Sequence, residues 1–201
     1  KRKKALYPAT YVESAVSLHY PKDGKAGGTW IGTSRNSRLI CLLNGGFSNH
    51  RRKASYAKSR GLIVKELLIA GNFKEKCLQI NLESIEPFTI VVVEWEEKRQ
   101  LLEFVWDGNK RHLQELPWQP SIWSSSTLYT SDMKAMRQEW FREWFIGKSM
   151  TPENILDFHK HGGLGFPEVD VFMRREKVGT VSITQVLKNQ EHLEMNYEDF
   201  I

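Results

Sequence analysis

Residues 88–95 read Phe88-Thr89-Ile90-Val91-Val92-Val93-Glu94-Trp95, and this run decides the fold class. It is almost unbroken in β-branched and aromatic residues, which is typical of a strand buried on both faces of a sheet. Gln100–Trp106 predicts a partner strand, and Asp107-Gly108-Asn109 predicts a hairpin turn into a further strand at Lys110–Leu116. The centre of the chain is therefore expected to form an antiparallel sheet.

Helices and strands come in groups on both sides of this sheet. On the N-terminal side the pattern predicts strands at Ser17–Tyr20, Gly27–Thr33 and Arg38–Leu43, a polar loop at Asn44–Arg60, and helices at Leu62–Ala70 and Asn72–Ile80. On the C-terminal side it predicts a strand after Pro120 that runs to Tyr129, a helix at 132–147 capped by Ser131 or Asp132, a helix from Thr151 to Gly162-Gly163, and strands at Val178–Val186 and His192–Tyr197. Grouped rather than alternating elements indicate an α+β fold with mainly antiparallel sheets. No repeat or long linker interrupts the pattern, so residues 1–201 are expected to form a single domain.

Cysteine and hydrophobic content exclude several classes of protein. The chain of 201 residues holds only two cysteines, Cys41 and Cys77, which excludes a disulfide scaffold or a Cys-rich zinc module and fits a reducing compartment such as the cytoplasm. The longest aliphatic run, Ile90–Val93, is far shorter than the roughly 18 residues of a membrane-spanning helix. The first residues lead into Ala5-Leu6-Tyr7-Pro8 rather than an apolar run, so no signal peptide is expected.

Positive charge is concentrated in two short segments. The formal net charge is +5, from 29 Lys plus Arg against 24 Asp plus Glu. One basic segment is Lys1–Lys4, and the other holds Arg51, Arg52, Lys53, Lys58 and Arg60, with no acidic residue between Asn44 and Lys65. A nucleic-acid-binding domain usually spreads such residues along a face within a recognisable module, so a nucleic-acid partner is not expected. The second segment is interpreted either as solvated surface or as a loop that meets an anionic group of a ligand.

No residue pattern indicates a metal or an organic cofactor, and none is expected. The chain has no phosphate-binding loop, dinucleotide fingerprint or nucleophile elbow, and His159 and His161 lie two positions apart, on different faces of a helix. Cys41 stands between two aliphatic residues, so an inert thiol is expected there. Asn44 ends an apolar strand before Gly45-Gly46. Its amide is interpreted either as a donor to an oxyanion or substrate carbonyl, or as the cap of an Asx turn.

Three blocks of sequence stand out: Gly27-Gly28-Thr29-Trp30-Ile31-Gly32, Leu42-Leu43-Asn44-Gly45 and Lys58-Ser59-Arg60-Gly61. In order and spacing they resemble the NRDE-motif family, whose eukaryotic member is a transport and Golgi organisation protein, and the Lys and aromatic content resembles that of a bacterial member. The family is similar to N-terminal-nucleophile hydrolases. That resemblance implies a four-layer αββα sandwich and a Cys nucleophile whose own α-amino group acts as the base.

The resemblance also implies a first strand with Met-Cys and the Asn-Arg-Asp-Glu signature, upstream of Lys1 and beside the strand of Cys41 or its neighbour. The nucleophile is then not in this chain. A strand-end Asn of the hydrolases aligns with Ser124–Ser126, and their late Arg aligns with Lys177, which lacks the planar fork of Arg. The implied site comprises Asn44 in an oxyanion role, with Arg60, Ser125, Lys177 and Trp30 in contact with the substrate.

Two functions follow from these expectations. One is Cys-dependent hydrolysis of an amide C–N bond in a small or acylated substrate. The other is binding, without turnover, of a hydrophobic or anionic ligand such as a lipid or haem, which rests on the resemblance alone. Both imply a small-molecule partner, and the sequence indicates no particular oligomeric state.

Overall fold

Two compact units make up the chain. The computed structural model describes residues 4–190 and 192–200. The first unit comprises the residues up to Pro120 together with Ser125–Leu128, and the second comprises Ser121–Ser124 and the residues from Tyr129 onward. That residues 1–201 form a single domain stays a prediction.

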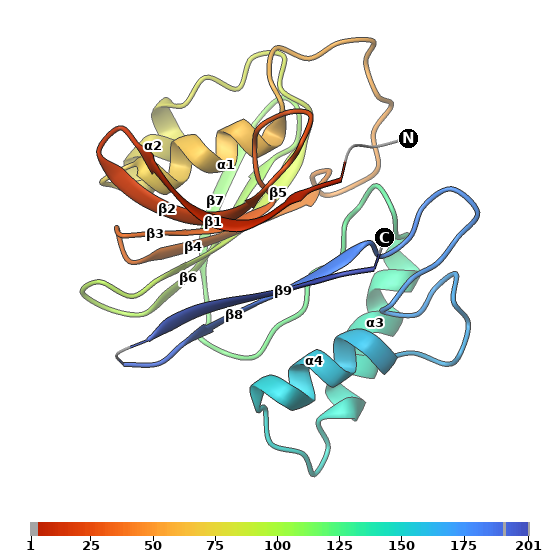
Figure 1. The fold of residues 1–201 in the computed structure, drawn as a ribbon. Helices are drawn as coiled ribbons and strands as arrows, with labels where there is room; N and C mark the ends of the chain where they lie inside the picture. The colour runs from red at the N-terminus through yellow and green to blue at the C-terminus, as the bar shows by residue number, and fades with distance from the viewer. Residues whose placement is uncertain (1–3, 191, 201) are drawn as a thin grey trace. The chain divides into compact units, whose positions relative to one another are not determined.

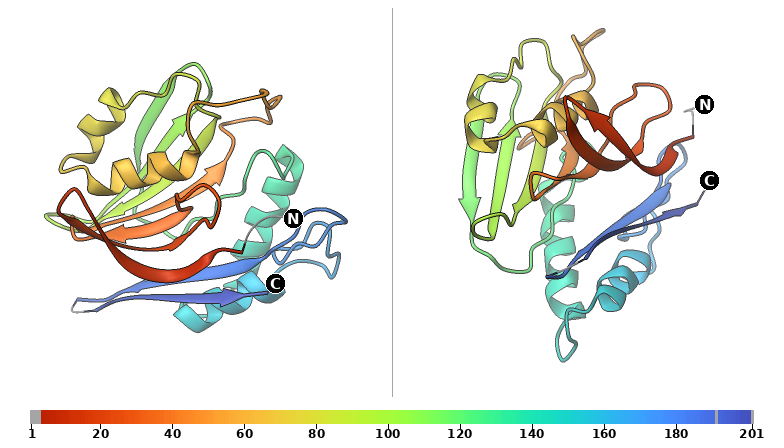
Figure 2. Two further views of the ribbon diagram at one scale, coloured as in Figure 1. Left: turned by 45° about the horizontal axis from the view of Figure 1, so that its top comes forward. Right: turned by 60° about the vertical axis from the view of Figure 1, so that its left-hand side comes forward.

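A seven-stranded antiparallel sheet is the frame of the first unit (Figure 1). Its strands are β1 (Leu6–Glu13), β2 (Val16–Lys22), β3 (Ile31–Ser34), β4 (Arg38–Asn44), β5 (Phe88–Glu94), β6 (Gln100–Trp106) and β7 (Arg111–Leu116). Each strand is hydrogen-bonded to the next one in sequence, so the sheet is a meander. Helices α1 (Arg60–Ile69) and α2 (Phe73–Gln79) come between β4 and β5 and lie on one face of the sheet (Figure 2). This arrangement confirms the expected mixture of helices with an antiparallel sheet.

The core of the first unit lies between the two helices and the sheet. Strand β5 pairs with β4 and β6 along its whole length. Ile90 and Val92 on its helix-facing side are fully buried, and Val91 on the opposite side is only 9% exposed. The predicted burial is confirmed for the helix-facing side, whereas on the opposite side only Val91 is buried and Thr89 and Val93 are half-buried. The core cluster also includes Leu18, Tyr20, Ile40, Ile63, Val64, Leu67, Leu68, Phe73, Cys77, Phe88, Leu102 and Phe104.

The Gly27–Trp30 block forms a close backbone joint with the start of α1. A Cβ atom on Gly28 would lie 2.4 Å from the carbonyl carbon of Gly61, a distance that real Cβ atoms do not reach. The N–H of Thr29 donates to the Gly61 carbonyl oxygen at 3.2 Å. Because this joint occupies residues 27–30, β3 begins only at Ile31, and the first part of the strand predicted over Gly27–Thr33 is wrong.

The second unit contains a two-stranded antiparallel sheet and two helices. Its elements are α3 (Ser131–Trp144), α4 (Pro152–His161), β8 (Ser182–Lys188) and β9 (Leu193–Asp199). Phe158 is fully buried in a cluster with Trp140 and Val171. Thr130, not Ser131 or Asp132 as predicted, caps α3, because its side chain accepts a hydrogen bond from the Met133 N–H. Among the described residues, no helix has both the length and the apolar character needed to cross a membrane.

One further strand predicted from the sequence is absent from the structure, and one strand of the structure was not predicted. The segment after Pro120 is irregular up to Tyr129, not a strand. Its serine hydroxyls bond to backbone instead: Ser125 Oγ donates to the Asn44 carbonyl oxygen at 2.7 Å, a local alternative to a strand ladder. Conversely, β1 was not predicted, because its hairpin turn to β2 places Ser14 and Ala15 at positive φ without Gly or Asn to mark it.

Strand β4, which carries Cys41, is bonded on both sides. Its neighbours are β3 and β5, and these are bonded in turn to β2 and β6. The expectation of a further strand beside the strand of Cys41 or its neighbour is therefore wrong for this sheet.

Candidate functional site

The end of β4 places Asn44 at one end of the sheet, opposite Phe88 of β5. The Asn44 side chain is exposed, and no hydrogen bond to it is formed by the described residues. Gly45 follows with φ +87°, and a Cβ on it would lie 2.2 Å from the hydroxyl of Ser126. Ser125 holds the backbone of Asn44 from the other side through its hydroxyl. Glycine is thus required here, both for its conformation and for the approach of the serine segment.

Arg60 reaches the same place from the first turn of α1. Its Nη1 donates to the Pro87 carbonyl oxygen at 3.2 Å, and the Gly45 N–H donates to that oxygen at 3.0 Å. The Arg60 side chain is 17% exposed. Burial lowers its pKa, and the neighbouring Glu86 opposes this effect. The structure thus brings Arg60 to the backbone of the Asn44–Gly45 turn, and it remains a prediction that the two face one pocket.

Glu86 is the carboxylate that organises the loop between β4 and α1. One of its oxygens lies 3.2 Å from Arg60 Nη2. The other lies 3.4 Å from His50 Nε2 and 3.8 Å from Arg52 Nε. With a side chain only 13% exposed, Glu86 takes up much of the positive charge that gathers around it. Sequence reasoning missed this residue, because nothing local marks an acid that pairs with bases 26–36 positions earlier.

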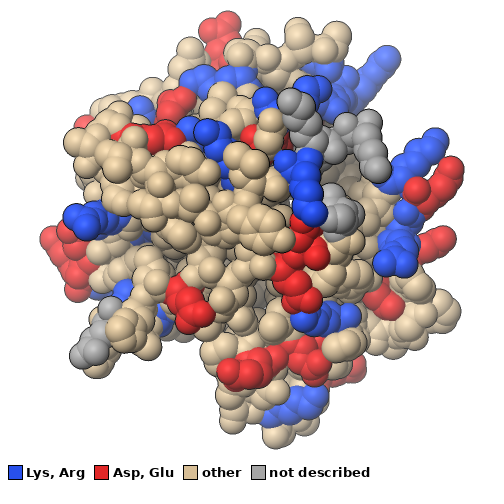
Figure 3. All heavy atoms as spheres, in the orientation of Figure 1, with Lys and Arg blue, Asp and Glu red and all other residues tan. Residues whose placement is uncertain are grey.

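Two exposed cations of the loop have no such partner. Arg51 and Lys53 are exposed, and no described acidic residue forms an ion pair with either. On the face drawn in Figure 3, Lys and Arg are interspersed with Asp and Glu, and its described residues form no continuous basic stripe. An anionic group that approaches the loop would therefore be attracted by individual cations of the loop, not by an extended positive potential over the surface.

An imidazole–carboxylate pair lies beside this loop. His112 Nε2 is 2.7 Å from Asp107 Oδ2. Phe47, 60% exposed, packs edge-on against the His112 ring with centroids 4.8 Å apart. The pKa of Asp107 is lowered to about 2, first by the hydrogen bond from the Lys110 N–H and then by His112. From the sequence, Asp107 was predicted only as a turn residue. Its partner His112 lies in β7, so the pair can be predicted only when the register of the hairpin is known.

The two thiols of the chain lack the environment of an activated nucleophile. Cys41 is half-buried in β4, and burial raises the pKa of its thiol to about 11. Burial also raises the pKa of Cys77. The thiolate, which is the reactive form, is disfavoured at both positions. The raised pKa agrees with the inert thiol expected at Cys41, and its low reactivity stays a prediction.

The other two implied site residues are Trp30 and Lys177. Trp30 is half-buried just before β3, and its carbonyl oxygen accepts the Leu42 N–H at 2.7 Å, two positions from Asn44. Lys177 is an exposed residue of the second unit, within the turn closed by the Arg174–Gly179 bridge. In the part of the chain that the structure describes, no three His, Cys, Asp or Glu residues gather so as to hold a metal ion.

The turn that holds Asn44 lies within the part of the chain that matches a known protein family. The family model described as transport and Golgi organisation 2, TANGO2, matches residues 6–160. The chain belongs to the TANGO2 family. The TANGO2 match runs from the start of β1 to α4 and includes Trp30, Asn44, Arg60 and Ser125, whereas Lys177 lies outside it. No curated protein matches the chain significantly.

Proposed function

We propose that this TANGO2-family chain binds a small anionic ligand with an apolar part, and that the loop from Gly45 to Arg60 contacts it. The observation that carries the proposal is the pair of exposed cations, Arg51 and Lys53, without carboxylate partners among the described residues. Phe47, exposed in the same loop, supplies an apolar surface. Arg60 and Glu86 support the loop from beneath by their ion pair. A fatty acid has this combination, with an apolar chain and one carboxylate, and so does haem, with an apolar ring system and two carboxylates.

The test is a fluorescence titration of the chain with oleate and, separately, with haem. Arg51→Gln/Lys53→Gln is expected to weaken binding about tenfold, since each exposed charge pair contributes up to ~1 kcal/mol. Phe47→Ala is expected to weaken it further. The matched control is Lys25→Gln/Arg35→Gln, which removes the same charge from exposed positions outside the loop. Equal losses in the two double variants, or none in either, would exclude the loop as the binding surface.

The second candidate is amide hydrolysis by an N-terminal-nucleophile mechanism. The exposed Asn44 amide at a strand end favours it, because such a donor is free to stabilise an oxyanion. We propose a four-layer αββα sandwich with it, since each unit pairs an antiparallel sheet with two helices. The nucleophile would be a Cys upstream of Lys1, because the thiols of Cys41 and Cys77 are disfavoured as thiolates.

Turnover of N-acyl amino acids and penicillin-type amides separates the two candidates. The chain that begins at Lys1 is expected to hydrolyse neither substrate. A longer form that carries an N-terminal Cys ahead of Lys1 is expected to hydrolyse one of them if the second candidate is right. Turnover by the shorter chain that is lost in Cys41→Ala would move the active site to Cys41. Absence of turnover in both proteins would leave ligand binding as the function.

A further inference from the structure

Four pairs of neighbouring residues in the chain join an Asn or Asp to a small residue: Asp23-Gly24, Asn36-Ser37, Asn44-Gly45 and Asp107-Gly108. A small second residue leaves the side-chain carbonyl carbon of the first open to attack by the backbone nitrogen of the second. Attack on an Asn expels ammonia and closes a succinimide ring, whereas an ionised Asp carboxylate resists the same attack. The two Asn pairs are therefore the more reactive ones, and hydrogen bonding in the fold decides which of them is free to react.

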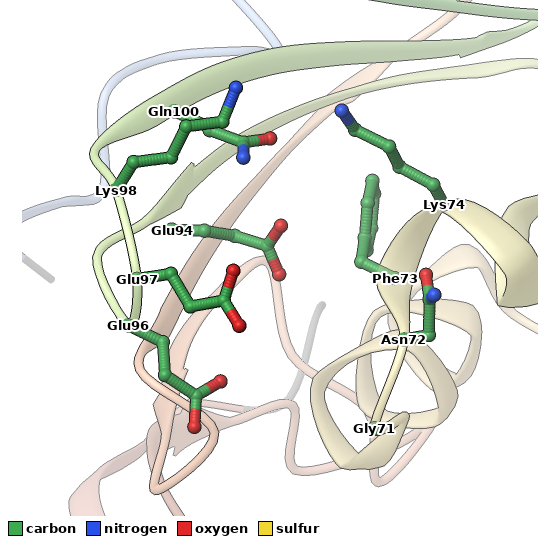
Figure 4. Close-up of a pocket in the computed structure, with 9 residues that line it drawn as sticks. All are labelled: Gly71, Asn72, Phe73, Lys74, Glu94, Glu96, Glu97, Lys98 and Gln100. Atoms are coloured by element: carbon green, nitrogen blue, oxygen red, sulfur yellow. The ribbon is translucent and has the colours of Figure 1, made fainter.

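Hydrogen bonds hold the side chain of the first residue in three of the four pairs. Oδ1 of Asp23 accepts two backbone N–H groups, at 2.8 and 2.7 Å, and Oδ1 of Asp107 accepts two at 2.7 Å. Nδ2 of Asn36 donates to two carbonyl oxygens at the end of α1, at 3.2 and 3.1 Å. Asn72 is held in the same way at the start of α2, where its Oδ1 accepts a helical N–H at 3.1 Å (Figure 4). These bonds must break before the side chain can meet the backbone nitrogen that follows it.

Asn44 differs, because its side chain is exposed and forms no hydrogen bond with the described residues. The fold holds the peptide group that follows it instead, at both ends. The Asn44 carbonyl oxygen accepts the Ser125 hydroxyl at 2.7 Å, and the Gly45 N–H donates to the Pro87 carbonyl oxygen at 3.0 Å. The Gly45 nitrogen must lose its proton and turn toward the Asn44 side chain to react, so these two bonds must open first. Local openings of this kind occur within the folded state and cost less free energy than global unfolding.

We propose that Asn44 is a site of spontaneous deamidation in the folded chain, at a rate set by the opening of the Asn44–Gly45 peptide group. Hydroxide removes the Gly45 amide proton, the nitrogen bonds to Cγ of Asn44, and the Cγ–Nδ2 bond breaks as Nδ2 leaves as ammonia with a proton from water. Water then adds to either carbonyl carbon of the succinimide and opens the ring, which leaves aspartate or isoaspartate at position 44. The modified chain carries one more negative charge in this turn and has lost the amide donor of Asn44.

Peptide mapping of the full chain by mass spectrometry, after incubation in mildly alkaline buffer, tests the proposal. In the folded chain, product is expected at Asn44 and not at Asn36. In denaturant both should react, and Asn44 should react faster than it does in the fold. Ser125→Ala releases the Asn44 carbonyl oxygen and is expected to speed the reaction of the folded chain about two- to tenfold, the effect of one hydrogen bond. The matched control is Ser55→Ala, which removes an exposed hydroxyl that bonds to no described residue and should leave the rate unchanged.

Asn36 serves as an internal monitor of unfolding, because its side chain is released only when its bonds to the end of α1 break. Equal acceleration at Asn44 and Asn36 in Ser125→Ala would indicate a general loss of stability rather than opening of the turn, and would overturn the proposal. Equal rates at Asn44 in the folded and the denatured chain, or an unchanged rate in Ser125→Ala, would overturn it too. Absence of product at Asn44 while the chain stays folded would show that the fold blocks the reaction altogether, which also contradicts the proposal.

Discussion

The guanidinium of Arg60 and the backbone N–H of Gly45 donate to one acceptor, the carbonyl oxygen of Pro87, at 3.2 and 3.0 Å. This shared acceptor joins the turn after β4 to the first residue of α1. The acceptor, Pro87, is the residue before β5. The turn after β4, the start of α1 and the start of β5 therefore meet at one carbonyl oxygen. Changes at this junction should therefore affect the stability of the fold.

Gly45→Ala is expected to lower the free energy of unfolding by about 1–3 kcal/mol, because alanine is strained at positive φ. The added Cβ would also meet the hydroxyl of Ser126 at 2.2 Å. Urea denaturation measures the loss. The control is Gly71→Ala, where a Cβ meets nothing within 4 Å, and a change within about 0.5 kcal/mol is expected there. Equal effects at the two glycines would contradict the strain at Gly45.

Glu86→Gln is expected to cost about 1–3 kcal/mol in unfolding free energy, because it leaves the largely buried Arg60 without its charge partner. A double-mutant cycle with Arg60→Gln isolates the pair. Removing both charges should cost less than the sum of the two single changes, by about 1 kcal/mol. Strict additivity would show that the two side chains contribute independently.

Alkylation by iodoacetamide should be slow in the folded chain. With the Cys41 pKa raised from 9.0 to about 11, its thiolate fraction at about pH 8 falls about 100-fold below that of an unperturbed thiol. The rate in the native chain is therefore expected to be at least about 100-fold below the rate in denaturant. Mass spectrometry of Cys41 and Cys77 peptides resolves the two sites. Rapid native labelling of Cys41 would contradict the burial of its thiol.

Acid should remove a stabilising contribution of Asp107. Its folded pKa is depressed from 3.8 to about 2, so the folded state binds fewer protons than the unfolded state across that interval. The contribution is present above pH 3.8 and is lost as the pH falls through about 2. Asp107→Asn is expected to flatten this part of the stability profile, measured by urea denaturation at several pH values. Glu83→Gln, at an exposed position, should retain the wild-type slope.

Local patterns were sufficient to predict much of the first unit. The hairpin from Gln100 to Leu116 and the helix that Asn72 caps both follow from short-range signals, namely alternation, turn residues and a capping side chain. The strand predicted for the serine-rich segment after Pro120 is wrong, because long-range contacts determine its conformation. Its β-branched and aromatic residues suggest a strand, but Ser125 and Ser126 bond to the backbone of residues 44 and 48, which lie far away in sequence.

The candidate site was predicted in part. Asn44 and Arg60 were chosen from their places at a strand end and a helix start, which local sequence can indicate. Glu86 and the Asp107–His112 pair depend on which strands are neighbours and in what register. Such pairing is a property of the whole sheet, so composition and spacing alone do not predict it.

The joint between Gly28 and Gly61 has a consequence for how relatives of this chain are recognised. At Gly28 and Gly61 two backbone segments are in contact, and a side chain at either position would force them apart. A search built on the sequence around these glycines selects proteins that share an architecture. Their reactions are free to diverge, because the contact between Gly28 and Gly61 is made by backbone atoms alone.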